Sequence, residues 1–158
     1  MPTPTEKDAC DLLDADHIAV KHLFVDYARL AYGSPPGGPD GDKLSLARKI
    51  CNALTVHAEI EEEIFYPELR AAIDQPQLLD EAEAEHQEAK ELIAQIEAQT
   101  AADATLDELV ATLAQAIEHH VKEERDYLFP KARASSLDLV EMAGRLQARQ
   151  QELEGQMA

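Results

Sequence analysis

The chain has 158 residues, and its 32 Asp and Glu against 14 Lys and Arg give a formal net charge of −18 with the His counted as neutral. So acidic a surface repels the phosphates of nucleic acids and anionic lipids, and we expect neither nucleic acid nor a membrane as a partner. No apolar run reaches the roughly 20 residues of a membrane span, and residues 1–13 lack the pattern of a signal peptide. We therefore expect a cytoplasmic protein, with Cys10 and Cys51 as free thiols.

Apolar residues recur every three or four positions, and the alternation typical of strands is missing, so the predicted fold is all-α. A first helix is expected from about Leu12 to Tyr32, followed by a surface loop rich in Gly and Pro from Gly33 to Gly41. A second helix is expected from about Asp42 and is bent or ended by Pro67.

The second half of the chain repeats this pattern. A third helix carries an apolar stripe from Leu79 to Ile96, and a fourth carries one over about residues 109–128. Pro67 lies ten positions after His57, and in the second half Pro130 lies ten positions after His120. The sequence therefore predicts an internal repeat and an antiparallel up-down four-helix bundle.

A weaker apolar stripe begins at Ser136 and predicts an additional C-terminal helix. We expect a bundle domain over residues 1–133 and a helical tail over residues 134–158. The tail either packs against the bundle or serves association, for example in a homodimer, and the sequence leaves both open.

Four His lie on the apolar faces of the four helices, each 13 to 15 residues from the connected end of its helix: His17, His57, His86 and His120. At about 1.5 Å of rise per residue, each lies about 20 Å from the loops that join its helix pair, so the four imidazoles should meet in one layer. Glu61 and Glu124 follow two of these His by four positions, which places them on the same helix faces.

A single His on an apolar face is ordinarily a hydrogen-bonded core residue. Four imidazoles and two carboxylates in one buried layer would instead cost several kcal/mol per uncompensated charge, which a metal cation removes. A purely structural polar layer is the alternative. Imidazole and carboxylate without thiolate suit iron, manganese or zinc and disfavour calcium. Six ligands overfill a tetrahedral zinc site but suit two octahedral ions, so we predict a dinuclear iron centre, with other divalent metals left open.

The complete pattern resembles the hemerythrin-like, or HHE cation-binding, family. The resemblance covers about Leu12 to Arg133, and its motifs are Asp16-His17, His57 to Glu61 running into Phe65-Tyr66-Pro67, Glu85-His86, and His120 to Glu124 running into Phe129-Pro130. It implies a non-haem di-iron centre with carboxylate and oxo or hydroxo bridges. The implied terminal ligands are His17, His57, His86 and His120, and the implied bridging carboxylates are Glu61 and Glu124.

The sequence departs from oxygen-carrying hemerythrins, which have a His-x-x-x-His pair on the third helix, because no second His lies four positions from His86. His22 and His119 lie off the apolar stripes, and we expect them on the outer surface or beside the ligands, with ligation as the alternative. Glu62 and Glu123 are expected in solvent or behind the ligands. A ferritin-like site needs Glu-x-x-His on two helices, and one such motif is present.

Three classes of function follow. The first is a protein that binds oxygen or nitric oxide at an open iron position, for sensing, storage or stress protection. The second is a di-iron enzyme, or a repair factor for iron centres damaged by oxidation or nitric oxide; an enzyme would need an external electron donor, since no flavin or nicotinamide motif is present. The third is a metal-stabilised interaction module that contacts a partner through the tail.

Overall fold

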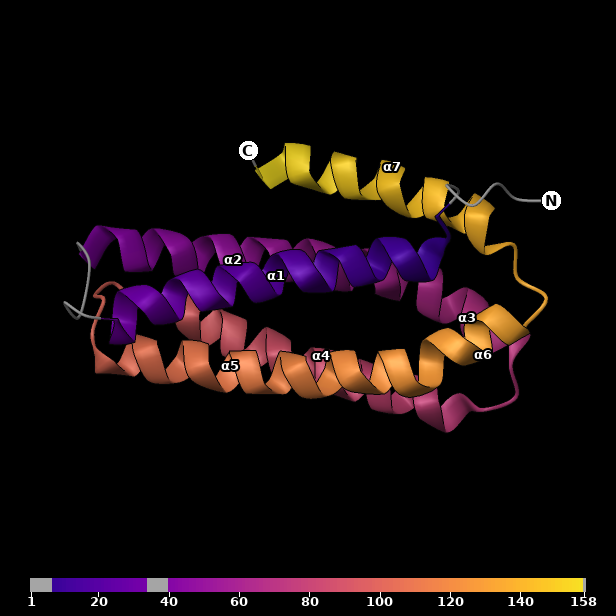
Figure 1. Cartoon of the computed structure of the whole chain (residues 1–158), viewed down its shortest axis with the longest axis horizontal. Helices are drawn as coiled ribbons and strands as arrows, with labels where there is room; N and C mark the ends of the chain where they lie inside the picture. The colour runs from indigo at the N-terminus through magenta and orange to yellow at the C-terminus, as the bar shows by residue number, and fades with distance from the viewer. Residues whose placement is uncertain (1–6, 34–39, 158) are drawn as a thin grey trace.

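The computed structural model describes residues 7–33 and 40–157, and all regular structure within these ranges is helical. Four long helices form its body: α1 (Ala9–Tyr32), α2 (Asp40–Ile60), α4 (Pro76–Glu97) and α5 (Ala104–Glu123). Helix α1 packs on α2 and α4 packs on α5, while contacts of α2 with α4 and of α1 with α5 close the ring (Figure 1). Consecutive long helices run antiparallel, which confirms the predicted all-α four-helix bundle.

The first two long helices begin earlier than predicted. Helix α1 starts at Ala9 because Asp8 caps it: the Asp8 carboxylate accepts a hydrogen bond from the Asp11 N–H at 2.9 Å, and the Asp11 carboxylate accepts from the Asp8 N–H at 3.1 Å. This reciprocal pair satisfies two N–H groups that the helix itself cannot. Helix α2 starts at Asp40, so the predicted loop ends sooner, and its residues 34–39 lie outside the described residues.

Each of α2 and α5 continues into a widened π-helical turn and then a short α-helix. These are η1 (Glu61–Phe65) with α3 (Tyr66–Ala72), and η2 (Glu124–Leu128) with α6 (Phe129–Ala134). In η1 the Tyr66 N–H donates to the Glu61 carbonyl five residues earlier, and in η2 the Phe129 N–H donates to the Glu124 carbonyl. Both π turns therefore begin at a Glu of the predicted site.

The two prolines explain these turns. Pro67 and Pro130 lie at the starts of α3 and α6. In a regular α-helix a proline ring clashes with the carbonyl four residues earlier and removes one hydrogen bond. A π turn before the proline spreads the backbone at that place. The helix therefore continues past Pro67 to Ala72 rather than ending there.

The buried core is divided into two apolar clusters by the layer of His side chains. One cluster includes Leu13 and Ile60 and continues under α3, α6 and α7. The other lies towards the opposite end of the bundle and includes Val20, Ile50 and Leu113. The polar layer is thus enclosed by apolar side chains on both sides, which lowers the local dielectric and strengthens its electrostatic interactions.

Helix α7 (Leu139–Met157) packs along α1, α2 and η1, where Met142 and Leu146 are fully buried (Figure 1). Its arginines also reach the bundle: Arg149 Nε lies 2.7 Å from a carboxylate oxygen of Glu63. The boundary between a bundle at residues 1–133 and a tail at 134–158 stays a prediction.

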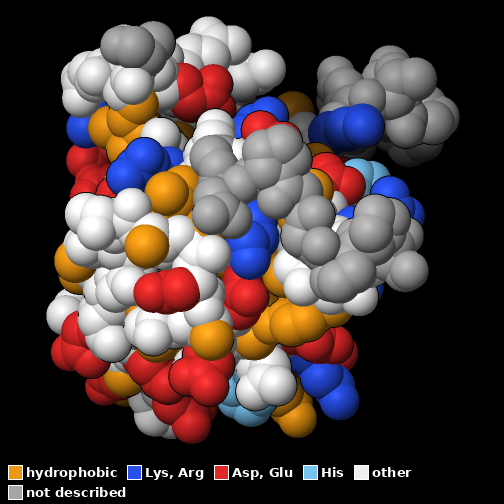
Figure 2. Space-filling view, turned by 90° about the vertical axis from the view of Figure 1, so that its left-hand side faces the viewer, with side chains coloured by type: hydrophobic (Ala, Val, Ile, Leu, Met, Phe, Trp, Pro, Cys, Tyr) orange, Lys and Arg blue, Asp and Glu red, His pale blue; other side chains and the backbone are white. Residues whose placement is uncertain are grey.

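Acidic side chains are spread over the end of the bundle that carries the α1–α2 and α4–α5 connections (Figure 2). Among the described residues, no helix is both long enough and apolar enough to cross a bilayer.

Candidate metal centre

The structure brings together all six side chains singled out from the sequence. Four long helices and both π turns supply them: His17 from α1, His57 from α2, Glu61 from η1, His86 from α4, His120 from α5 and Glu124 from η2. The two carboxylates are fully buried, and none of the imidazole residues is more than 7% exposed. Their assignment as metal ligands stays a prediction.

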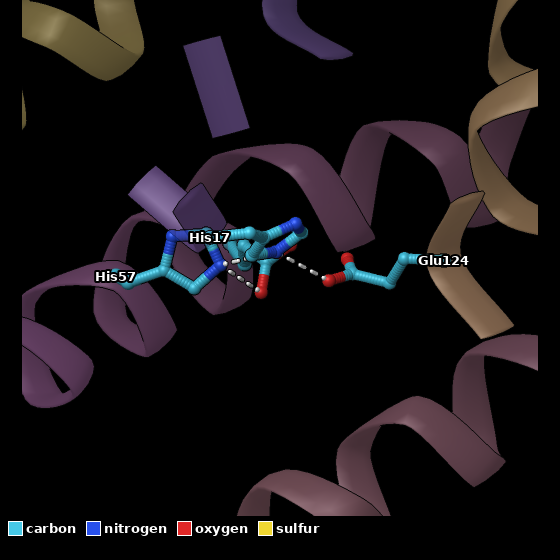
Figure 3. A group of neighbouring side chains, drawn as sticks. His17, His57 and Glu124 are labelled. Carbon is cyan, nitrogen blue, oxygen red and sulfur yellow. Dashed lines mark hydrogen bonds and ion pairs between the residues drawn. The ribbon is translucent and has the colours of Figure 1, made fainter. Parts of the chain in front are cut away.

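The first half of the centre is formed by His17 and His57, whose Nε2 atoms lie 3.1 Å apart. The Nε2 atom of His57 is 3.1 Å from Glu61 Oε1, and that of His17 is 3.1 Å from Glu124 Oε1. Figure 3 shows the two imidazoles meeting in the middle of the bundle and Glu124 reaching them from the other side.

The second half mirrors the first. The Nε2 atoms of His86 and His120 are also 3.1 Å apart. The Nε2 atom of His86 lies 3.1 Å from Glu61 Oε1, and that of His120 lies 3.2 Å from Glu124 Oε1. Each carboxylate therefore touches one imidazole of each pair, which is the arrangement needed to bridge two cations.

Each imidazole is oriented by a further carboxylate behind it, at its Nδ1 atom. The pairs are His17 with Asp14 (3.2 Å), His57 with Asp16 (3.1 Å), His86 with Glu62 (3.0 Å) and His120 with Glu85 (2.8 Å). A neutral imidazole that donates from Nδ1 must present a lone pair at Nε2, and carboxylate partners of this kind commonly orient metal-binding His. All four lone pairs then face the centre.

The distances fit cations between these atoms. Two ligands about 2.1 Å from one metal ion, at right angles, are about 3.0 Å apart, close to the separations above. Glu61 Oε2 and Glu124 Oε1 are completely buried and make no hydrogen bond. The contacts of Glu124 Oε1 with two Nε2 atoms are ion pairs only if those nitrogens carry protons, so either protons or cations must occupy the middle of the layer.

Tyr66 is a further member of the centre that the sequence analysis did not identify. Its fully buried hydroxyl lies 3.2 Å from Nε2 of both His86 and His120 and 3.2 Å from Glu124 Oε2. In the repeat its counterpart is Phe129, nine residues after His120, and this ring stacks at 6.0 Å on His17. A phenolic oxygen therefore lies beside His86 and His120, whereas an aromatic ring lies beside His17.

Without a cation, the carboxylates hold protons on the imidazoles of His57 and His120. Burial alone would lower the pKa of His57, but the charge of Glu61 and hydrogen bonds with Asp16 and Glu61 raise it to about 10. Burial opposes Glu124 in the same way at His120, whose pKa is raised well above the ordinary value. Burial would raise the pKa of Glu61, yet the nearby His57 charge holds it well below its usual range. A cation that binds these groups must displace protons.

The remaining candidates lie outside the centre. His22 is exposed on α1. The His119 side chain is 65% exposed and faces Glu85 and Glu123 instead of the other His. Glu62 lies behind His86, where Lys90 also contacts it at 2.7 Å. The expectation that these groups lie on the surface or behind the ligands agrees with these positions.

An apolar cavity of about 280 Å³ lies against the centre. All four central imidazoles line it, and its walls carry Val20, Leu54, Ala89, Ile93 and Ile117. Asp16, Glu59, Lys90 and Glu97 line it too, so a small molecule in this cavity would meet the His layer through mostly apolar surroundings.

A helical bundle whose buried His and Glu side chains converge in one layer defines a class of cation-binding proteins, and comparisons with known proteins agree. The structure is similar to the crystal structure of a hemerythrin HHE cation-binding domain-containing protein from Mycobacterium kansasii, with a TM-score of 0.77, 20% identity, and coverage of 95% of this chain and 89% of that chain. At this identity the likeness shows the fold. No curated protein matches the chain.

The model of the hemerythrin HHE cation-binding domain matches residues 8–132. The chain therefore belongs to the hemerythrin HHE cation-binding domain family, as the resemblance of its motifs predicted. Its buried His and Glu cluster is compatible with the binding of a metal ion.

Proposed function

We propose that the chain is a non-haem di-iron protein that binds a small diatomic ligand, oxygen or nitric oxide, at one of its two ions. The observation that carries this proposal is the convergence of four Nε2 atoms on two buried carboxylates, each of which touches both His pairs. In this proposal the imidazoles of His17, His57, His86 and His120 hold the ions, and Glu61 and Glu124 bridge them.

The donor types support iron. The centre offers imidazole nitrogen and carboxylate and phenolic oxygen, and both cysteines lie elsewhere in the core. This set suits iron or manganese in octahedral geometry better than tetrahedral zinc, which six or more protein ligands would overfill. Two groups of donors sharing Glu61 support two ions rather than one.

The two proposed metal positions are not equivalent. This difference supports an open coordination position at the ion held by His17 and His57. Both positions share Glu61 and Glu124 and have two imidazoles each, but Tyr66 adds an oxygen donor beside His86 and His120 alone. With octahedral geometry at both ions, the position between His17 and His57 therefore has one protein donor fewer. We infer that the small ligand binds there.

The apolar cavity supports a neutral and small ligand. Mostly apolar walls favour uncharged gases over ions. When bound, iron would supply redox chemistry and an affinity for oxygen or nitric oxide. The protein contributes the orientation of the imidazoles through the carboxylates behind them, and the path by which a gas reaches the layer.

A gas titration tests this function. The metal-free chain is loaded anaerobically with two equivalents of ferrous iron and titrated with nitric oxide, while absorption is followed. We expect a spectral change that saturates near one nitric oxide per chain and reverses when argon removes the gas. A chain that holds its iron but shows no spectral response to nitric oxide or oxygen would overturn the ligand-binding role.

A further inference from the structure

A second His and Glu cluster lies on the surface, beside the centre but separate from it. It consists of Glu85, His119 and Glu123, whose ligand atoms all lie within 4.8 Å of one another. The Nε2 atom of His119 is 3.3 Å from Glu85 Oε2 and 3.1 Å from Glu123 Oε1. These separations match those expected for neighbouring ligands of one cation, about 3.0 Å.

Two members of this surface cluster, Glu85 and Glu123, line a cavity of about 220 Å³ that reaches the centre. The charged residues that line it are all acidic: Glu81, Glu85, Glu123 and Glu124. His120 lines it as well, so the cavity joins the surface carboxylates to one imidazole and one bridging carboxylate of the centre. Its volume has room for several water molecules, and hence for a partly hydrated cation.

A buried carboxylate of the centre lies at the inner end of this cavity. Glu124 is fully buried, and its Oε1 atom lies 3.1 Å from Nε2 of His17 and 3.2 Å from Nε2 of His120. When these imidazoles are neutral, the buried oxygen has no donor, and an approaching cation removes the cost of its burial. The acidic cavity leads to this carboxylate from outside and has no Lys or Arg among the described residues that line it, whereas Lys90 lines the larger apolar cavity together with Asp16, Glu59 and Glu97.

Glu85 links the two places directly. Its Oε2 atom faces His119, and its Oε1 atom lies 2.8 Å from Nδ1 of His120. The corresponding carboxylates behind His17 and His86 are instead held by permanent cations, Arg125 on Asp14 at 2.6 Å and Lys90 on Glu62 at 2.7 Å. Behind His120, Glu85 is contacted instead by His119, a side chain that can itself bind a metal ion.

We propose that Glu85, His119 and Glu123 form a transient binding site for a divalent cation, from which the ion passes through the acidic cavity to the centre. This inference rests on the proposed metal centre. The surface site captures the cation with three ligands, and the four carboxylates of the cavity lower its energy on the way inward. The net charge of −18 assists capture by attracting cations to the protein.

The test measures how fast the metal-free chain takes up Co²⁺, whose visible absorption rises when imidazole and carboxylate ligands replace water. The variant is His119→Gln with Glu123→Gln, because both residues lie outside the proposed centre, whereas Glu85 orients His120. The matched control is His22→Gln with Glu108→Gln, which also removes one imidazole and one carboxylate from exposed positions but leaves the cavity intact. Circular dichroism checks that all chains fold equally.

We expect uptake by the variant to be slower by about tenfold and to depend less on salt, with the same final cobalt content as the wild type. The control should match the wild type. An unchanged uptake rate in the variant would overturn the route, and so would a lower final cobalt content, since the residues would then belong to the centre. A wild-type chain that takes up no cobalt would overturn the metal centre itself, and the wild-type trace alone shows this.

Discussion

Tyr66 and Phe129 occupy equivalent positions in the two halves of the chain, and Tyr66 brings a hydroxyl group into the centre where Phe129 stacks on His17. The repeat is thus symmetric in its imidazoles and carboxylates but not in this pair. The asymmetry distinguishes the two proposed metal positions, because it gives one of them an additional oxygen donor.

The first prediction concerns Tyr66→Phe. This variant should fold, because its counterpart at position 129 is already a phenylalanine directly after a π turn of the same kind. It should keep its iron, which four imidazoles and two carboxylates still hold. A phenol bound to ferric iron gives a visible absorption band, and this band should disappear. The control Tyr127→Phe, at an exposed position, should keep the band. An unchanged spectrum in Tyr66→Phe would show that the phenol does not bind metal.

The second prediction concerns the apolar cavity. Ala89 is a buried residue of α4 that lines this cavity, so Ala89→Leu should fill part of the cavity volume. We expect association of nitric oxide with the iron-loaded chain to slow several-fold in stopped-flow absorption, with unchanged iron content. A control, Ala84→Leu, adds the same volume at an exposed position of the same helix. Equal association rates in both variants would place the gas path elsewhere.

The third prediction concerns helix α7. Leu146 is fully buried against the bundle, so Leu146→Ala should lower the free energy of unfolding by about 2–5 kcal/mol. Val140→Ala on the same helix, where the side chain is 41% exposed, should change it by less than about 1 kcal/mol. Urea denaturation measures both. Equal stability of the two variants would favour association over packing as the role of this helix.

The fourth prediction concerns the cysteines. Burial raises the pKa of both Cys10 and Cys51 from 9.0 to about 12. Both thiols should therefore resist alkylation at pH 8 until the chain is unfolded. The unfolded chain loses these protons first, so their contribution to stability is complete below pH 9 and falls as the pH rises towards 12. Replacement of both by Ala should flatten this part of the pH dependence of the free energy of unfolding. Rapid alkylation of the folded chain would contradict the burial.

The sequence could predict the His layer because regular helices have a constant rise, so positions counted from the loops fix the height of each imidazole. It could not predict Tyr66 from that geometry. In a regular helix at about 100° per residue, Tyr66 would lie about 140° around the axis from Glu61. The π turn brings a residue five positions on to nearly the same face. The signal was Pro67, six residues after Glu61, a spacing that recurs at Pro130.

The surface cluster was also beyond sequence reasoning, for another physical reason. His119 lies off the apolar face of its helix, and its exposure agrees with the prediction from the helical period. Its neighbour Glu85 comes from a different helix, and the distance between them depends on how α4 and α5 pack. Periodicity places a residue on a face of its own helix, but it does not fix contacts across helices.

The iron content of the chain is the most direct test of the central claim. The metal-free protein is incubated anaerobically with excess ferrous iron, freed of unbound metal, and analysed for iron and protein. We predict two iron ions per chain in the wild type and in His22→Ala, and a clear loss of iron in both His57→Ala and Glu124→Ala. A wild-type chain that folds equally well without retaining iron, or central variants that keep two ions, would contradict the account.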